Sequence, residues 1–335
     1  MKVVFAFVLM SLMGSLVYCK QNVFAVEIGG TIEAYAASRL RDDARTMQTL
    51  RPGEQGDTYQ TIFRFGSYAY TWEKKANSGG TLRRWNINSE GKLKETDVER
   101  STSSGPIHVQ APSDTLVTDR IIVIDGFGKF VQVLDHENFD IIAQIQGPTE
   151  YPFELTPAAA VLTSNYLYVA YWIGEGRSVM IEYDPTKNYD KFYEKLLDFE
   201  VTSLATATNA DIYALGWPGN SLYRLDINTL EWKAQTTAAC AEGLNILLLS
   251  EDQDICYVAC NAIFAFAITE EKLEPLCQSE QAGASNIVYW NNRLYASGFG
   301  ISQFKIKNSG GQNGCPVLNI QAPGQYQGML AVIPY

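Results

Sequence analysis

The chain has 335 residues, with 26 Lys and Arg against 37 Asp and Glu, so its formal net charge is −11. The acidic residues are scattered rather than grouped in runs. Nucleic-acid binding needs a basic stripe, and attraction to an anionic membrane surface needs clustered Lys and Arg. The composition therefore argues against both kinds of partner and favours a soluble protein.

Residues 1–19 have the pattern of a secretory signal peptide. A positive residue precedes an apolar run over residues 3–17, and Cys19 offers a cleavage position. The run is shorter than the roughly 20 residues that a membrane span needs. We expect cleavage after Cys19, with an earlier site after Gly14 as the alternative. Residues 20–335 are then expected to form one exported domain, with no membrane contact after signal removal.

A hairpin repeat organises the mature chain. Asp211–Asp226 shows it clearly, as an alternating strand, a Pro-Gly-Asn turn and a second strand. Similar hairpins occur six more times, aligned by one position: Phe24, Tyr68, Ile122, Tyr168, Tyr213, Tyr257 and Tyr295. The period of about 45 residues, with further strand-like runs on each side, is typical of a four-stranded propeller blade. An ordinary β-sandwich with coincidental strand spacing is the alternative.

The first unit begins directly with its second strand, at Asn22. A run with the composition of a first strand, Gly328–Pro334, appears at the far end of the chain. We expect it to pair with Asn22–Gly29, because this closure leaves the ring without an open edge. The predicted fold class is all-β, a seven-bladed β-propeller of four-stranded antiparallel blades closed by the C-terminal strand.

Two segments between the hairpins are less regular. Residues 101–112 are predicted to form a polar loop before the third unit. Residues 188–199 carry apolar side chains at helical spacing, so two interpretations remain there, an outer strand or a short surface helix.

Side chains suited to catalysis are scarce. The two histidines, His108 and His136, are separated by a whole hairpin, which argues against a Ser/His/Asp triad or a histidine metal site. We therefore expect no cofactor and no metal. Asp135, Asp184 and Asp226 end the third strand of three units. They could form a ring of carboxylates, but Asp that caps its own turn is the favoured interpretation.

Five cysteines follow the signal sequence: Cys240, Cys256, Cys260, Cys277 and Cys315. An exported protein is expected to oxidise some of them. Cys256 and Cys260 lie on one strand about 13 Å apart, too far to bond. Cys240 precedes the first strand of the sixth unit and Cys260 ends its second strand, at the same face, so we predict this pair. Because five is odd, one thiol is free, buried or intermolecular.

Large aromatic residues recur four positions after the alignment residue of the hairpin. They are Trp72, Trp172, Trp217 and Phe299, and Phe127 is adjacent to this position in the third unit. All end the second strand, so they should share one face of the disc. They could stack on sugars or other flat ligands, or pack between blades. We predict these five residues as ligand-binding, and we expect at least two of Trp72, Trp172, Trp217 and Phe299 to be partly exposed.

The hairpins, the split blade and the third strands that end in Asp resemble the broad seven-bladed β-propeller superfamily of quinoprotein-like, YVTN-like and WD40-like repeats. Those strand ends are Val133-Leu-Asp135, Glu182-Tyr-Asp184 and Arg224-Leu-Asp226. The Gly-His and Trp-Asp pairs of WD40 repeats and the Ser-x-Asp-x-Gly boxes of sialidases are missing. The resemblance therefore implies a fold and carries over no catalytic or cofactor residue.

Export, repeat architecture and few catalytic side chains favour an extracellular binding or scaffold protein, such as a matrix, coat or lectin-like component. Its expected partner is an extracellular protein or a carbohydrate. The alternative is a secreted carboxylate-dependent enzyme, such as a glycoside-active hydrolase or lyase. That enzyme would show two carboxylates within about 10 Å in a central pocket, one with a raised pKa.

Overall fold

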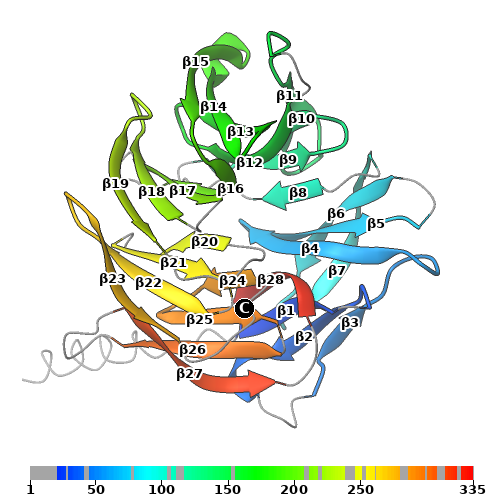
Figure 1. Cartoon of the computed structure of the whole chain (residues 1–335). Coiled ribbons are helices and arrows are strands. Elements are labelled where there is room, and N and C mark those ends of the chain that lie inside the picture. Colours follow the sequence, from blue (N-terminus) through cyan, green and yellow to red (C-terminus); the bar gives the residue numbers. More distant parts are fainter. Residues whose placement is uncertain are drawn as a thin grey trace, which may run out of the picture.

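Seven four-stranded antiparallel sheets surround a common axis in the computed structural model (Figure 1). The prediction of an all-β, seven-bladed β-propeller is confirmed. The structure describes residues 21–334 apart from 28, 41–44, 77–78, 104–106, 111–116, 152–154, 207–210, 218–220, 238–245, 251–253, 261, 280–285, 299, 308–313 and 323–325.

Each blade runs from an innermost first strand to an outermost fourth strand, and the blades are numbered from 1 to 7 as their second strands follow along the chain. The first strands are β28 (Tyr326–Pro334), β4 (Thr58–Phe65), β8 (Ile107–Gln110), β12 (Thr156–Leu162), β16 (Glu200–Thr206), β20 (Ile246–Leu249) and β24 (Asn286–Tyr289). The second strands are β1 (Gln21–Glu27), β5 (Tyr68–Lys74), β9 (Arg120–Asp125), β13 (Leu167–Gly174), β17 (Asp211–Trp217), β21 (Ile255–Ala259) and β25 (Arg293–Ser297). The third strands are β2 (Ile32–Ala36), β6 (Gly80–Ile87), β10 (Phe130–Asp135), β14 (Arg177–Asp184), β18 (Ser221–Asp226), β22 (Ile263–Ile268) and β26 (Ile301–Lys307). The fourth strands are β3 (Gln48–Leu50), β7 (Leu93–Thr102), β11 (Ile141–Gln146), β15 (Asp190–Leu197), β19 (Trp232–Thr237), β23 (Leu273–Gln278) and β27 (Cys315–Ala322). Two short 3-10 helices, η1 (Ala37–Arg39) and η2 (Pro185–Lys187), follow β2 and β14.

The last strand closes the ring, as predicted. β28 pairs antiparallel with β1, so that Gln21 faces Pro334 and Phe24 faces Ala331. Figure 1 shows β28 inside the ring, between β24 and β1. Strands from the two ends of the chain therefore share blade 1, and no first strand is left unpaired at the closure.

The disc has two faces, which differ in the turns that they carry. The BC face holds the turns between second and third strands and the points where the first strands begin. The AB face holds the turns between first and second strands and those between third and fourth strands. The face on which a strand begins or ends therefore fixes where its terminal side chains lie.

The hydrophobic core is divided among the interfaces between blades. One cluster, for example, joins Met180 of blade 4 to Leu225 and Leu230 of blade 5, all fully buried. Each sheet is buried on both faces because each packs against two neighbours. The outermost strands are irregular: the pairing of third and fourth strands shifts register in every blade from 2 to 7. Such bulges discourage edge-to-edge association with other chains.

A buried tyrosine on the second strand ties one blade to the next. The hydroxyl of Tyr168 in blade 4 donates to the carbonyl of Ile227 in blade 5 at 3.2 Å, just after Asp226. The hydroxyl of Tyr70 in blade 2 donates in the same way to the carbonyl of His136 in blade 3 at 3.0 Å. The residue of blade 2 that is equivalent to Tyr168 is therefore Tyr70, and not Tyr68 as the sequence alignment placed it. The two tyrosines differ by one strand period, so both keep the apolar pattern and the sequence does not separate them.

The aspartates that end three third strands cap their own turns. Asp135 Oδ1 accepts from the backbone N–H of Glu137 at 2.8 Å, and Asp184 Oδ1 accepts from that of Thr186 at 2.8 Å. Asp226 Oδ1 accepts from that of Asn228 at 2.8 Å. The favoured interpretation, a structural turn rather than a ring of carboxylates, is confirmed for these residues.

Two local expectations are settled by the strands. Residues 190–197 form β15, so the segment that allowed a strand or a helix is an outer strand. The predicted loop over residues 101–112 is wrong in part, because β7 extends to Thr102 and β8 covers Ile107–Gln110. Ser101 and Thr102 end an outermost strand, with Ser101 exposed and Thr102 half-buried, and Val109 is fully buried. His108 is therefore on a first strand and not in a loop.

Candidate functional site

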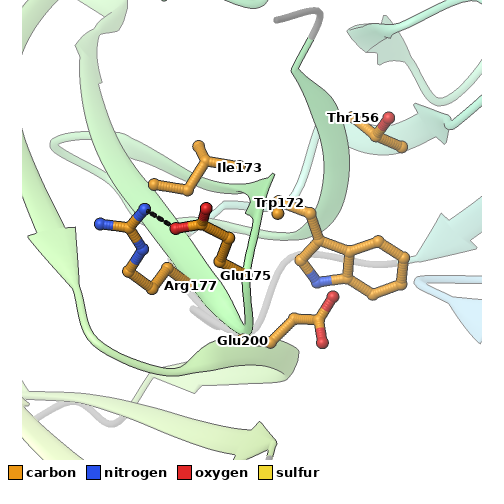
Figure 2. A pocket seen from close by; sticks show the side chains of 7 residues that line it. Thr156, Trp172, Ile173, Glu175, Arg177 and Glu200 are labelled. Atoms are coloured by element: carbon orange, nitrogen blue, oxygen red, sulfur yellow. Dashed lines mark hydrogen bonds and ion pairs between the residues drawn. The ribbon is translucent and has the colours of Figure 1, made fainter.

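A cavity of about 540 Å³ opens on the BC face between blades 4 and 5. This volume falls within the roughly 300–1,000 Å³ typical of small-ligand sites. The wall comes from the starts of β12 and β16 and from the β13–β14 turn (Figure 2). It comprises Thr156, Trp172, Ile173, Gly174, Glu175, Arg177 and Glu200. We call it the Trp172 pocket.

Trp172 lies near the end of β13, opposite Thr156 on β12. Tyr168 and Ala170, on the same side of the strand, pack against blade 5, so alternation points the indole toward that blade as well. Its Nε1 donates to the carbonyl oxygen of Val201 at 2.7 Å, while 39% of the residue remains exposed. The ring is thus held in one orientation by a hydrogen bond and still offers surface to a ligand.

Glu200 is the first residue of β16 and is half-buried. The next residue, Val201, binds blade 4 twice, since its N–H donates to Ser178 Oγ at 2.9 Å and its carbonyl accepts from Trp172. These bonds fix the backbone that presents the Glu200 side chain to the pocket. No hydrogen bond or ion pair joins Glu200 to the described residues, so its oxygens are available as acceptors.

The β13–β14 turn forms the rim of the pocket. Gly174, Glu175 and Gly176 all have positive φ, of 82°, 55° and 70°. A left-handed conformation is unusual for a residue with a side chain, such as Glu175, and the two flanking glycines adopt it without strain. Arg177 Nη2 donates to Glu175 Oε2 at 2.6 Å, which holds both side chains at the rim (Figure 2).

The combination of an indole face and carboxylates suits a polyhydroxylated ligand. The C–H face of a sugar ring can pack on an indole, and its hydroxyls can donate to a carboxylate such as that of Glu200. Arg177 supplies N–H donors for a ring or hydroxyl oxygen. The pocket therefore offers the apolar surface and the few convergent polar groups that small-ligand sites share.

Two other predicted aromatic residues lie on the BC face without lining this pocket. Trp217 occupies in blade 5 the position of Trp172 in blade 4, and it is half-buried. Alternation points it toward blade 6, because Tyr213 and Leu215 pack with Val258 there. Residues 238–245, which lead into the first strand of blade 6, are outside the described residues. Phe127, in the turn after β9, is 73% exposed.

Trp72 belongs to the core between blades 2 and 3. It is 2% exposed, packs with Ile121 and Phe139, and donates from Nε1 to Thr102 Oγ1 at 2.8 Å. Because Tyr70 is equivalent to Tyr168, the residue of blade 2 that is equivalent to Trp172 is exposed Lys74. Trp72 lies two residues before it on the same strand. Trp72 therefore offers no surface to a ligand.

The predicted Phe299 and Cys240 lie outside the described residues. Cys260 is disulfide-bonded and Cys256 is a buried free thiol, so the Cys240–Cys260 pair stays a prediction. A second disulfide joins Cys277 to Cys315, on the outermost strands of blades 6 and 7.

The pairing of Cys277 with Cys315 was not predicted from the sequence. A signal for it existed, because Cys277 follows Tyr257 at the same distance as Cys315 follows Tyr295. Equal positions in successive blades lie side by side in a propeller.

One buried carboxyl group has a strongly altered pKa. Burial first, and then the negative charge of Asp184, raises the pKa of Glu182 to about 7. Glu182 lies on β14, the third strand of blade 4, is 3% exposed, and faces the same side as Met180, toward blade 5. Glu182 is therefore within the packing between blades 4 and 5, Asp184 caps the turn beside it, and neither residue lines the Trp172 pocket.

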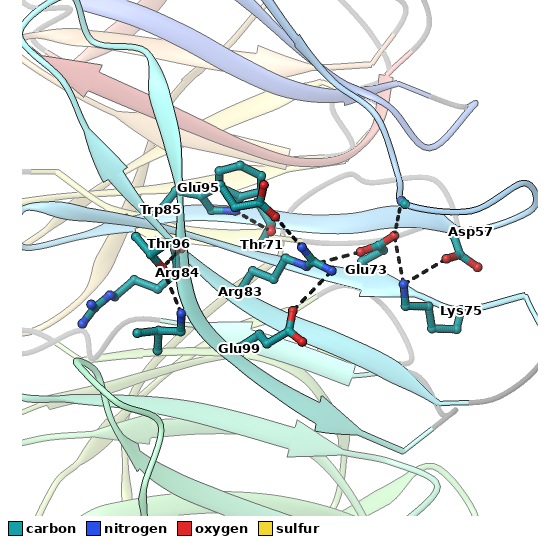
Figure 3. A network of polar contacts seen from close by, with 12 residues as sticks. Asp57, Thr71, Glu73, Lys75, Arg83, Arg84, Trp85, Glu95, Thr96 and Glu99 are labelled. Carbon is teal, nitrogen blue, oxygen red and sulfur yellow. Dashed lines mark hydrogen bonds and ion pairs between the residues drawn. The ribbon is translucent and has the colours of Figure 1, made fainter.

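A polar network on the BC side of blade 2 fixes the connection from blade 1 (Figure 3). Glu73, fully buried, accepts from the backbone N–H of Gly53 at 2.8 Å and lies 3.6 Å from Arg83. Lys75 bridges Glu73 and Asp57, at 3.4 and 3.0 Å. Hydrogen bonds led by the N–H of Ala76 lower the pKa of Asp57. Because these charges pair with one another, we assign the network the structural role of holding the connection between blades 1 and 2.

Within the described part of the chain, no cluster of three or more His, Cys, Asp and Glu side chains has an arrangement that could hold a metal ion. Nor does any helix there have the length and apolar character to cross a membrane.

Comparisons with known proteins identify the fold and no narrower family. No protein-family profile and no curated protein sequence matches the chain. A Bacteroides fragilis protein, named provisionally as a 6-phosphogluconolactonase, is similar with a TM-score of 0.67 at 12% identity, over 95% of this chain and 99% of that one. A Bacteroides uniformis protein with the same provisional name gives a TM-score of 0.69 at 12% identity, over 94% and 99%.

The β-propeller domain of Myceliophteria thermophila Cps50 (Swd1) gives a TM-score of 0.60 at 14% identity, over 85% of this chain and 91% of that one. At such identities the likeness concerns the fold alone. The comparisons thus agree with the seven-bladed β-propeller fold that the resemblance implied.

Proposed function

We propose that this protein is a secreted binding protein that takes a carbohydrate into the Trp172 pocket. The observation that carries the proposal is the setting of Trp172. Its indole is fixed by the carbonyl of Val201, is 39% exposed, and adjoins the carboxylate of Glu200, unpaired among the described residues, in a cavity of about 540 Å³. The signal-like N-terminus supports export, and the repeat fold supports a binding role.

The charge of the chain narrows the class of sugar. With a net charge of −11, the protein repels polyanions at long range. Among the described residues of the pocket wall, the one cation, Arg177, is already paired with Glu175. A neutral glycan is therefore the expected ligand. Stacking contributes about 1 kcal/mol and a hydrogen bond to a carboxylate roughly 1.5–3 kcal/mol, so affinity for a single sugar is expected to be weak.

Retention on a panel of immobilised neutral glycans tests the proposal. Trp172→Ala and Glu200→Gln should each lose retention of the glycan that the wild type binds. Trp232→Ala is the matched control, because Trp232 is 40% exposed but lies on β19, outside the pocket. Equal loss in the control, or full retention by Trp172→Ala, would remove the pocket from the binding site. Release of shortened sugars from the panel would favour the hydrolase alternative instead.

A further inference from the structure

Arg64 and Trp290 meet on the AB face, opposite the Trp172 pocket. Arg64 is near the end of β4 in blade 2, and Trp290 directly follows β24 in blade 7. The guanidinium carbon lies 5.4 Å from the centroid of the indole ring. Blades 2 and 7 are not neighbours, since β28 of blade 1 lies between β4 and β24 and contacts both (Figure 1). Arg64 therefore reaches past the inner strand of blade 1 to contact Trp290.

Both members of this contact are held by short turns. Trp290 and Arg293 exchange two backbone hydrogen bonds, of 2.8 and 3.1 Å, around Asn291 and Asn292, both with positive φ. Arg64 pairs with Ala69 across the turn that joins β4 to β5. A guanidinium stacked on an aromatic ring keeps its edge N–H groups free for other acceptors. The contact with Trp290 thus restricts the positions that the Arg64 guanidinium can adopt.

Arg64 lacks the carboxylate or carbonyl partner that arginines of similar or greater burial have in the described part of the chain. Arg177 and Arg224 pair with carboxylates at 2.6 Å, and Arg100 donates to the carbonyl of Phe139 at 3.0 Å. Arg64 makes no hydrogen bond or ion pair within the described residues, and its Nε is buried without an acceptor. Burial lowers the pKa of Arg64, and no charged side chain among the described residues offsets this effect.

Arg64 is partly desolvated and its Nε has no acceptor among the described residues, which is costly, and native structures seldom retain such a group without a reason. In a chain with a net charge of −11, a carboxylate partner would be easy to supply, and none is placed beside Arg64 by the described residues. We propose that Arg64, braced by Trp290, binds a small oxyanion on the AB face. The planar fork of donors matches a carboxylate or a phosphate group, either of which could belong to a small metabolite.

Isothermal titration calorimetry of the full mature protein, in chloride buffer of low ionic strength, tests this site with two ligands. Inorganic phosphate represents the phosphate source and succinate the carboxylate source. At least one should bind the wild type, and the one that binds identifies the source. Arg64→Gln should weaken that binding at least tenfold. Arg64→Lys keeps the positive charge but lacks the planar set of N–H donors, so its affinity for the anion should lie between those of the wild type and Arg64→Gln. Lys94→Gln, which removes an exposed cation from the outermost strand of the same blade, should bind as the wild type does.

Thermal melting separates loss of the site from loss of the fold. Because Arg64→Gln removes an unpaired charge, it should melt at the same temperature as the wild type or higher in chloride buffer. The anion that binds should raise the melting temperature of the wild type and leave that of Arg64→Gln unchanged. Absence of binding by both anions, or equal binding by Arg64→Gln, would overturn the proposal. Neither result would affect glycan binding on the opposite face.

Discussion

The interface between blades 2 and 3 and that between blades 4 and 5 each carry a tryptophan near the end of a second strand. Trp72 is sealed between blades 2 and 3, whereas Trp172 opens into the pocket between blades 4 and 5. Both interfaces are joined by the same tyrosine hydrogen bond, from Tyr70 or Tyr168 to the turn of the next blade. Trp72 lies two residues nearer than Trp172 to the shared tyrosine of its strand, and this difference places Trp72 in the core and Trp172 at the surface.

The two interfaces also differ beside the tyrosine. Tyr168 pairs across the sheet with Glu182, whereas Tyr70 pairs with Arg84. Arg84 stacks over the ring of Tyr68 at 4.3 Å and keeps its charge near the surface. Glu182 is instead buried with a raised pKa. Blades with the same backbone arrangement thus carry different side chains at equivalent positions, here Glu182 and Arg84. These positions can differ because the recurring contacts of the fold do not depend on them.

Replacing the two tryptophans should give the largest contrast. Trp72→Ala removes a buried ring and its bond to Thr102, and should lower the free energy of unfolding by about 3–5 kcal/mol. Trp172→Ala removes a partly exposed ring and should cost roughly 1–2 kcal/mol. Urea unfolding of both variants measures the difference. Equal losses would mean that Trp172 is as much a core residue as Trp72.

Glu182 should make the interface between blades 4 and 5 sensitive to pH. Its pKa in the folded chain, about 7, exceeds the ordinary value of 4.5, so the folded state retains a proton that the unfolded state releases. The stability that this proton supports is complete below about pH 4.5 and is lost as the pH rises through 7.

Glu182→Gln should therefore stabilise the protein at pH 8 relative to the wild type, by on the order of 1–3 kcal/mol, and have little effect at pH 4. Melting temperatures of both proteins across this range test the expectation. Arg84→Gln, at the equivalent position of blade 2, is the control and should not reproduce this pH dependence. A constant difference between wild type and Glu182→Gln at all pH values would contradict the assignment.

The tyrosine bond should contribute equally to both interfaces. Tyr70→Phe and Tyr168→Phe each leave a turn carbonyl without its donor and should cost about 0.5–1.5 kcal/mol. Tyr193→Phe, on the exposed outer strand β15, is the matched control and should be neutral. Denaturant midpoints compare the three variants. A loss confined to one interface would show that the shared hydrogen bond is not a shared source of stability.

Much of the architecture was predictable because a repeat averages over local ambiguity. The period, the split blade 1 and the turn-capping Asp135 all depend on patterns that recur, and the structure confirms them. The register within blade 2 was not predictable, because Tyr68 and Tyr70 lie on the same side of one strand and fit the pattern equally well. The error of one strand period carried over to Trp72.

The site was predictable only in part, for a related reason. Trp172 could be placed on a face of the disc from its strand position, but Glu200 and Arg177 reach the pocket from other strands. Which side chains meet there depends on the packing of blade 4 against blade 5, and no local pattern encodes it. The contact between Arg64 and Trp290 likewise could not be predicted, because the two residues are remote in the chain.

Nuclear magnetic resonance of the tryptophan indole N–H groups tests the central claim most directly. The chain has six tryptophans, so their signals can be assigned by single substitutions and followed as a neutral oligosaccharide retained by the protein is added. The indole signal of Trp172 should shift in proportion to occupancy, while that of buried Trp72 should stay fixed. Saturable binding that leaves the Trp172 signal unmoved would contradict the assignment of the pocket.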